Sequence, residues 1–184
     1  VGLYKMDKLD QLGVAKYIKI FQNDYVGSET LSSYWAPEIM YLQGRWYVYF
    51  APEVNRGGND SHRTYVLQGG SNPNDPTDGA YVLKGRLADV NDKWSIDATA
   101  FEYNGKLYSV WSGWEGDTNV SQKIYIAEMS NPWTLSTNRV CISTPTYNWE
   151  TNTSPQVNEG PEVLIKNNKV HIIYSASGSW TDSY

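Results

Sequence analysis

Two acidic residues stand at the starts of apolar segments, where carboxylates suit acid–base chemistry. Asp97 lies within the run "SIDATAF", and Glu159 directly precedes "GPEVLI". A charge that enters a buried strand costs free energy unless it is paired or serves a purpose. Two carboxylates that converge on one cavity from neighbouring repeats suit general acid and base catalysis. The alternative is that each is a strand-end acid that makes a local hydrogen bond.

The elements that must position these acids recur along the chain. "APEIMYLQGRWYVYF" starts at Ala36, "DATAFEYNGKLYSVW" starts at Asp97, and "GPEVLIKNNKVHIIY" starts at Gly160. The spacings are 61 residues (97 − 36) and 63 residues (160 − 97). Each segment predicts two apolar strands joined by a two-residue turn, because Asn-Gly and similar pairs between apolar runs favour a hairpin. The three predicted turns are Gln43-Gly44, Asn104-Gly105 and Asn167-Asn168.

The remainder of the unit also repeats, with a third strand followed by Ser-Asn-Pro and then a short outer strand at 80–87 or 139–144. Four short antiparallel strands per repeat are typical of a β-propeller blade, and a β-sandwich is the competing architecture. The predicted units span 34–90, 95–145 and 158–184, after the end of an earlier blade at 1–30 that has its outer strand at 15–22. Because propellers close with at least four blades, we expect the domain at 1–184 to be a partial propeller. Its exposed blade edges would allow self-association.

Composition narrows the function classes. The 184 residues are 40% hydrophobic and 19% charged, which supports a packed core rather than disorder. The net charge of −5 and the lack of a basic stripe argue against nucleic acid and anionic membranes as partners. No apolar run reaches the length of a membrane span, and the first residues lack the layout of a signal peptide. The single Cys141 forms no internal disulfide, and no ligand spacing indicates a metal or another cofactor.

Aromatic residues are abundant, with eight Trp and fifteen Tyr. Such rings suit β-sheets, and they also suit stacking against sugars. Trp35 is the first candidate for a sugar-stacking ring because it adjoins Ala36 at the start of a repeat, and Trp180 and Trp114 are further candidates. Packing within the sheets is the alternative for each ring. Glu38 and Glu162 recur at equivalent repeat positions, so we expect them to be structural.

Three segments also carry a family likeness: "WAPEI" (35–39), "SIDATAFEYNGKLYSVWSG" (95–113) and "NEGPEVLIKNNKVHIIYSASGSW" (158–180). They resemble glycoside hydrolase family 43, and most of all its α-L-arabinofuranosidase branch. The resemblance implies a five-bladed β-propeller that removes α-L-arabinofuranosyl units, with inversion, from plant polysaccharides such as arabinan or arabinoxylan. A β-xylosidase or endo-arabinanase of the same family and a non-catalytic carbohydrate-binding propeller are the alternatives. The resemblance allows calcium in the channel, and sequons at 59–61, 119–121 and 152–154 permit a secreted, extracellular location.

The same resemblance implies residue roles. Glu159 corresponds to the general acid, and Asp97 corresponds to the carboxylate that orients this acid and raises its pKa. The general base would be an aspartate before the innermost strand of a first blade. Asp7, Asp10 and Asp24 lie in the wrong context for that role. We therefore expect an enzyme whose isolated 184-residue chain is inactive because it lacks the base.

Overall fold

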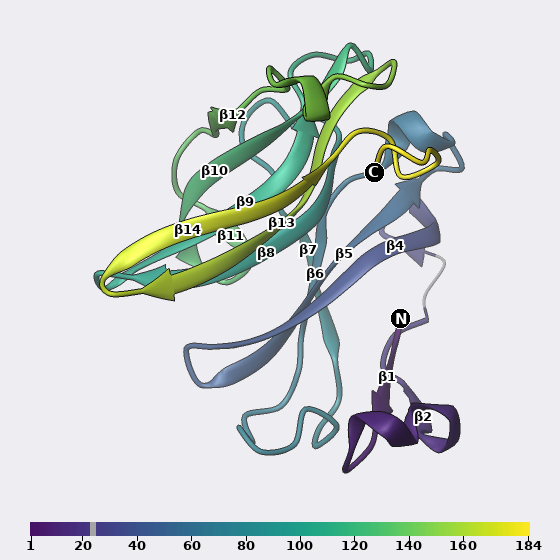
Figure 1. Cartoon of the computed structure of the whole chain (residues 1–184). Helices are drawn as coiled ribbons and strands as arrows, with labels where there is room; N and C mark the ends of the chain where they lie inside the picture. Colours follow the sequence, from purple (N-terminus) through teal and green to yellow (C-terminus); the bar gives the residue numbers. More distant parts are fainter. Residues whose placement is uncertain (23–24) are drawn as a thin grey trace.

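The computed structural model describes residues 1–22 and 25–184, and their regular secondary structure is almost entirely β-strand (Figure 1). Helical structure in this described part is limited to three short 3-10 segments, Leu9–Val14 (η1), Asn59–Ser61 (η2) and Asn148–Glu150 (η3). The all-β class predicted from the sequence is confirmed. Asp24, one of the aspartates rejected as a general base, lies outside the described residues.

The first large sheet runs from Tyr25 to Arg86 and overlaps the unit predicted at 34–90. Its strands lie side by side in chain order, each antiparallel to the next. They are β3 (Tyr25–Val26), β4 (Glu29–Leu42), β5 (Arg45–Val54), β6 (Tyr65–Gln68) and β7 (Val82–Arg86). The outer strand predicted at 80–87 is therefore present as β7.

The second sheet joins the other two predicted units. Antiparallel pairing links β8 to β9, β9 to β10, and β10 to both β11 and β12, while a short parallel contact links β10 to the β13–β14 hairpin. The strands are β8 (Ser95–Tyr103), β9 (Lys106–Trp114), β10 (Ser121–Asn131), β11 (Thr134–Leu135), β12 (Val140–Ser143), β13 (Gln156–Lys166) and β14 (Lys169–Ala176). The outer strand predicted at 139–144 is present as β12.

The three predicted hairpin turns are confirmed by their backbone angles. All six central residues, at 43–44, 104–105 and 167–168, have positive φ between 49° and 79°. Positive φ at both central positions matches the right-handed twist of the flanking strands. The turns therefore fix the register of the hairpins that carry the candidate site.

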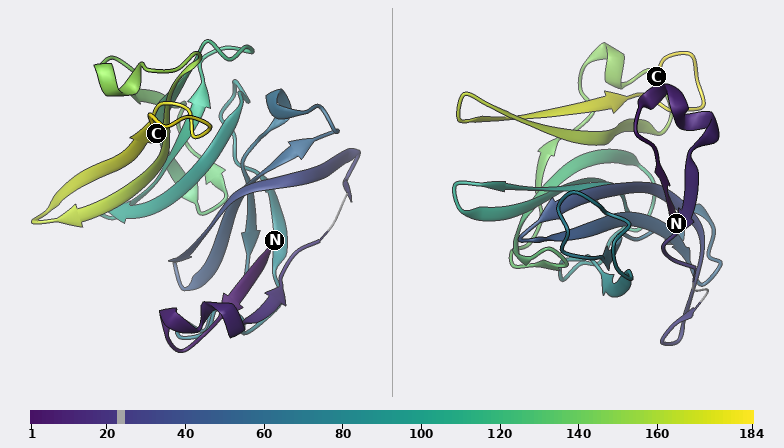
Figure 2. Two further views of the ribbon diagram at one scale, coloured as in Figure 1. Left: turned by 45° about the vertical axis from the view of Figure 1, so that its right-hand side comes forward. Right: turned by 90° about the horizontal axis from the view of Figure 1, so that it is seen from below.

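The three long hairpins pack face to face, and both views of Figure 2 show them as successive layers. Tyr49 of β5 lies in one apolar cluster with Ala98 of β8, and its hydroxyl donates to the Pro132 carbonyl at 2.6 Å. Val110 of β9 shares a second cluster with Val163 of β13. This stacking brings the middle of β4 together with the first halves of β8 and β13, although these segments are about sixty residues apart in sequence.

The N-terminal segment forms a ladder of its own and packs on the first sheet, where Phe21 contacts Phe50 with 5.7 Å between ring centroids. The strand predicted at 15–22 is present as β2 (Lys16–Lys19), but within the described part of the chain its ladder is with β1 (Gly2–Lys5) and not with either large sheet. Asp7 and Asp10 belong to this segment, which is drawn at the bottom of Figure 1, below the β13–β14 hairpin.

Candidate active site

Strands β4, β8 and β13 each contain an irregularity at the same position of the repeat. Their pairing shifts between Trp35 and Glu38, between Ile96 and Thr99, and between Glu159 and Glu162. A β-bulge of this kind bends the strand and re-aims its side chains.

The residue at the centre of each bulge has a left-handed backbone. The φ angle is 43° at Ala36, 54° at Asp97 and 60° at Gly160. Non-glycine residues seldom adopt this region, so the fold imposes this geometry on Ala36 and Asp97. The equivalence of the three positions, predicted from their spacing, is confirmed.

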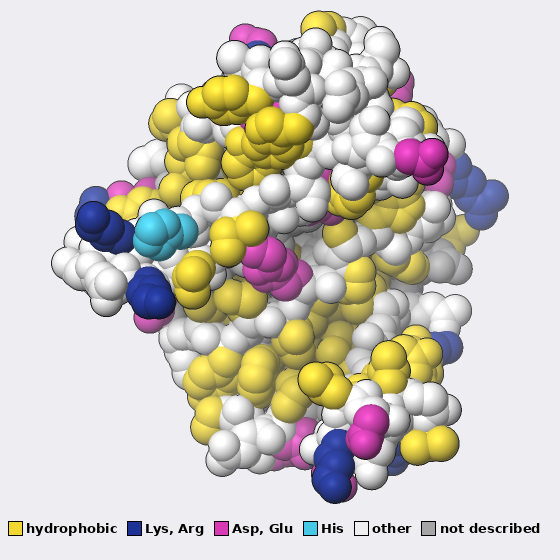
Figure 3. Space-filling model, in the orientation of Figure 1, with side chains coloured by type: hydrophobic (Ala, Val, Ile, Leu, Met, Phe, Trp, Pro, Cys, Tyr) yellow, Lys and Arg dark blue, Asp and Glu magenta, His cyan; other side chains and the backbone are white. Residues whose placement is uncertain are grey.

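The three bulges line one cavity of about 240 Å³. Its walls are Ala36, Pro37 and Glu38 from β4, Asp97 from β8, and Gly160, Pro161 and Glu162 from β13. Figure 3 shows acidic side chains in the middle of the molecular face on which the β13–β14 hairpin and β4 lie, with hydrophobic side chains around them. The structure thus brings Asp97 and the Glu-Gly-Pro segment together.

Glu159 is nearly buried, with 8% of its surface exposed. Burial, followed by the negative charge of Asp97, raises the pKa of Glu159 to about 7, and a hydrogen bond from the Tyr184 hydroxyl opposes this rise. A carboxyl group with this pKa still carries its proton over much of the neutral range. Glu159 can therefore donate a proton where an ordinary glutamate is already ionised.

Asp97 lies close to Glu159, and its carboxylate is hydrogen-bonded to the β13 bulge that contains Gly160. The backbone N–H of Gly160 donates to Asp97 Oδ2 at 3.0 Å. Burial raises the pKa of Asp97, while the hydrogen bond from Gly160 favours the charged form. This bond connects β8 directly to the residue that follows Glu159.

Glu38 belongs to the same cluster, which the sequence did not predict. Thr99 donates from Oγ1 to Glu38 Oε1 at 2.6 Å. Burial is the main cause that raises the pKa of Glu38 to about 7; the Thr99 hydrogen bond opposes the rise, and the charge and hydrogen bond of Glu162 add to it. Glu38 and Glu162 both line the cavity with Asp97, and their expected structural role stays a prediction. The available signal was an acid at the same repeat position in two of three units.

The predicted sugar-stacking rings differ in their surroundings. Trp35 is 39% exposed and stacks on the buried His62, with 3.8 Å between ring centroids. Trp180 is 62% exposed and its ring packs against the backbone of Gly178, where an added Cβ would lie 2.4 Å from the indole. Both rings can offer a face to a ligand.

Trp114 requires a correction. Only 1% of its surface is exposed, and its ring stacks on the equally buried Trp94 at 4.7 Å. Both rings share a cluster with Ala51 and Ile96. Trp114 is therefore a packing residue, because no face of its indole is available to a sugar.

The described residues contain neither a group of metal ligands nor a membrane-spanning helix. In residues 1–22 and 25–184, no group of three or more His, Cys, Asp or Glu side chains could hold a metal ion. The calcium that the resemblance allows has no such ligand set among these residues. No helix found in these same residues has the length and apolar character needed to cross a membrane.

The chain is similar to known proteins in sequence and in fold. Residues 16–184 match the sequence model of the family described as "Glycosyl hydrolases family 43". The chain is 40% identical over 149 residues to an extracellular exo-α-(1→5)-L-arabinofuranosidase of Streptomyces avermitilis, which covers 79% of this chain and 29% of that protein. It is 39% identical over 147 residues to α-L-arabinofuranosidase 43 of Humicola insolens, with the same coverage of 79% and 29%.

A solved structure is also similar. The crystal structure of an α-L-arabinofuranosidase from Lactobacillus brevis has a TM-score of 0.82 and 35% identity, and it covers 97% of this chain and 56% of that chain. The chain therefore spans less than a third of the length of the two sequence relatives and just over half of the solved one.

Proposed function

Because the chain belongs to glycosyl hydrolase family 43, we propose that it is part of an enzyme that removes α-L-arabinofuranosyl units from plant polysaccharides such as arabinan or arabinoxylan. The observation that carries this proposal is the pair of Glu159 and Asp97 at the bulges of β13 and β8. Burial and like charge hold the proton on Glu159 near neutral pH. A glycosidase needs such a group to protonate the oxygen of the departing sugar.

In this proposal Glu159 is the general acid and Asp97 sets its pKa and its position. Two carboxylates close together resist joint ionisation, so an ionised Asp97 keeps the proton on Glu159. The Gly160 hydrogen bond to Asp97 holds this arrangement in place at 3.0 Å. Trp35 and Trp180 are the proposed stacking rings for the sugar, and their exposed faces support this assignment.

We propose that the reaction inverts the anomeric carbon, as in the family that the motifs resemble. Inversion requires a base about 6.5–9.5 Å from the acid, on the far side of a water molecule. We propose that neither Asp7 nor Asp10 is that base, because both belong to the N-terminal segment that holds η1 and neither lies at the bulges of β4, β8 and β13. The isolated 184-residue chain is then expected to bind sugar without hydrolysing it.

The architecture proposed for the whole domain is a β-propeller of which these residues form a part. The support is the repeated antiparallel hairpins with equivalent bulges that pack in layers. The proposed partner is an arabinose- or xylose-containing oligosaccharide or polysaccharide, and open sheet edges would allow self-association. An extracellular location is proposed because relatives from two Streptomyces species are named extracellular enzymes.

The test compares the 184-residue chain with the full-length protein that contains it. We expect the full-length protein to release arabinose from an aryl α-L-arabinofuranoside, and NMR should show the inverted anomer as the first product. The isolated chain should release none. Preferred hydrolysis of an aryl β-D-xyloside would indicate a β-xylosidase instead. Internal cleavage of arabinan would indicate an endo-arabinanase. Sugar binding without hydrolysis by the full-length protein would indicate a carbohydrate-binding module instead.

A further inference from the structure

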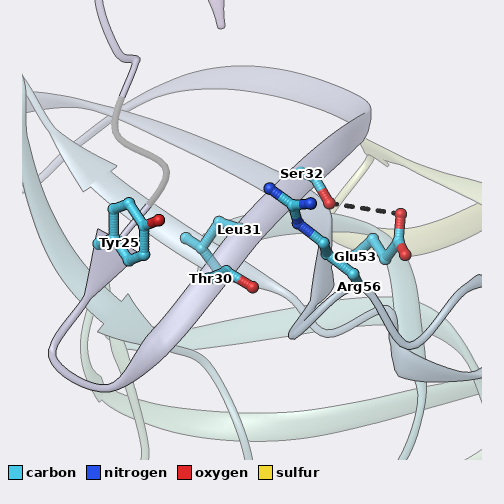
Figure 4. Close-up of a pocket in the computed structure, with 6 residues that line it drawn as sticks. All are labelled: Tyr25, Thr30, Leu31, Ser32, Glu53 and Arg56. Carbon is cyan, nitrogen blue, oxygen red and sulfur yellow. Dashed lines mark hydrogen bonds between the residues drawn. The ribbon is translucent and has the colours of Figure 1, made fainter.

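A second pocket lies in the first sheet where β4 begins and β5 ends, and it is separate from the cavity around Asp97. It has a volume of about 400 Å³. Its lining residues, drawn in Figure 4, are Tyr25, Thr30, Leu31, Ser32, Glu53 and Arg56. None of them belongs to the acidic cluster already described.

This pocket lies next to Trp35 on the same ladder. Ser32 pairs with Glu53, and the next pair along β4 and β5 is Trp35 with Ala51, after the bulge. Glu53 and Ala51 are two residues apart on one strand, so their side chains project from the same face of the sheet. The Trp35–Ala51 pair and the pocket residues Ser32 and Glu53 are therefore neighbours on one face of the sheet.

The backbone that carries Arg56 is firmly held. Asn55 and Arg56 have φ of 54° and 53°. The Asn55 N–H donates to the Thr30 carbonyl at 2.8 Å, and Asn55 Oδ1 accepts from the Thr30 N–H at 2.9 Å. The next turn closes through the Gly57 N–H and the Val54 carbonyl at 3.0 Å. These bonds fix the direction in which the Arg56 side chain leaves the loop.

Of the two charged side chains in the pocket, Glu53 already makes hydrogen bonds within the described residues, and Arg56 does not. Glu53 accepts hydrogen bonds from Ser32 Oγ at 3.3 Å, drawn as a dashed line in Figure 4, and from the Gly58 N–H at 2.8 Å. The Arg56 guanidinium, drawn beside Ser32, has no hydrogen bond or ion pair with any residue in the described part of the chain. Its five N–H donors remain available to a ligand.

We propose that this pocket binds the sugar residue next to the one that stacks on Trp35, with Arg56 donating to its hydroxyl oxygens. This inference rests on the proposed function, and it extends the substrate site along β4. A neutral sugar fits best, because the Glu53 carboxylate balances the guanidinium charge and can accept from a hydroxyl group. A few well-placed polar groups beside an aromatic ring are the usual means by which a pocket orients such a ligand.

The test measures binding, so that it does not depend on catalysis. In the full-length protein carrying Glu159→Gln, calorimetry gives the affinities for α-(1→5)-linked arabinotriose and for arabinose. Arg56→Gln should weaken arabinotriose binding about tenfold relative to arabinose, the loss expected for one hydrogen bond to a charged group. Arg45→Gln is the matched control, because Arg45 is exposed at the other end of β5 and donates to the Gly69 carbonyl. This control should leave the ratio of affinities unchanged.

Each outcome supports or overturns the inference. An unchanged ratio in Arg56→Gln, or an equal loss in Arg45→Gln, overturns it. Tighter binding of a uronic-acid-bearing oligosaccharide than of its neutral counterpart, lost with Arg56→Gln, overturns the assignment to a neutral sugar. If the wild-type protein hydrolyses no arabinofuranoside while Arg56→Gln still lowers the ratio, the proposed function falls and the pocket assignment holds.

Discussion

The indole of Trp35 lies flat on the imidazole of His62, with ring centroids 3.8 Å apart and planes inclined by 24°. His62 is 1% exposed, and its Nδ1 is 3.0 Å from the carbonyl oxygen of Ala51, the residue that pairs with Trp35. Burial lowers the pKa of His62, which favours the neutral ring. One face of the indole is thus covered from within the protein, and His62 fixes the plane on which a sugar would lie.

Removal of this support should affect substrate binding more than chemistry. We expect His62→Ala to raise KM several-fold with a smaller change in kcat, because the indole loses the ring beneath it. His62→Phe restores a flat ring and should recover most of the affinity. Steady-state kinetics of the full-length protein provide the measurement, and thermal unfolding of both variants reports any loss of stability. Equal KM values for the Ala and Phe variants would contradict the supporting role.

Replacement of the proposed acid should depend on the leaving group. Glu159→Gln removes the proton donor, so kcat on an oligosaccharide should fall by about 10²–10⁴-fold. A dinitrophenyl glycoside needs little protonation and should lose much less. Glu102→Gln is a suitable control, because Glu102 is exposed near the end of β8. The same loss on both substrates would show that Glu159 is not the acid.

Asp97 should set the pH at which activity declines. Its charge is the second cause, after burial, of the raised pKa of Glu159. Asp97→Asn removes that charge, so the pKa of Glu159 should fall from about 7 towards its ordinary value. The alkaline limb of the profile of kcat against pH should then move to lower pH. A limb that stays in place would assign Asp97 to positioning alone.

Glu38 should make the fold less stable as pH rises. In the folded chain its pKa is about 7, against 4.5 for the free group, so the native state binds the proton more tightly than the unfolded state. Stability from this group is therefore present below pH 4.5 and lost as pH rises through about 7. The pKa of Glu159 is also raised from 4.5 to about 7, so this group lowers the stability of the fold over the same pH range.

Chemical unfolding at about pH 5 and about pH 8, on either side of the raised pKa, checks this prediction. Glu38→Gln should reduce the difference in unfolding free energy between the two pH values, because Gln can still accept from Thr99 but does not ionise. The exposed Glu102→Gln variant serves again as the control. If the difference in unfolding free energy between the two pH values is the same in Glu38→Gln and in the wild-type chain, Glu38 is not the group that takes up the proton.

The sequence by itself determined the hairpins, their turns and the equivalence of Ala36, Asp97 and Gly160. Turn chemistry and alternation of apolar residues are local properties, so they can be read from neighbouring residues. A constant repeat then places equivalent positions of successive hairpins together. For this reason the proximity of Asp97 to the Glu159 segment follows from the spacing of the repeats alone.

Only the tertiary structure decided which rings are covered and which acids have a raised pKa. Trp35 and Trp114 are both aromatic residues in long strands, yet Trp114 is buried against Trp94 while Trp35 keeps one face exposed. Glu38 meets Thr99 from a strand some sixty residues away. Burial and electrostatic coupling depend on which segments pack together across the layers, and this packing determined the proton affinity of Glu38.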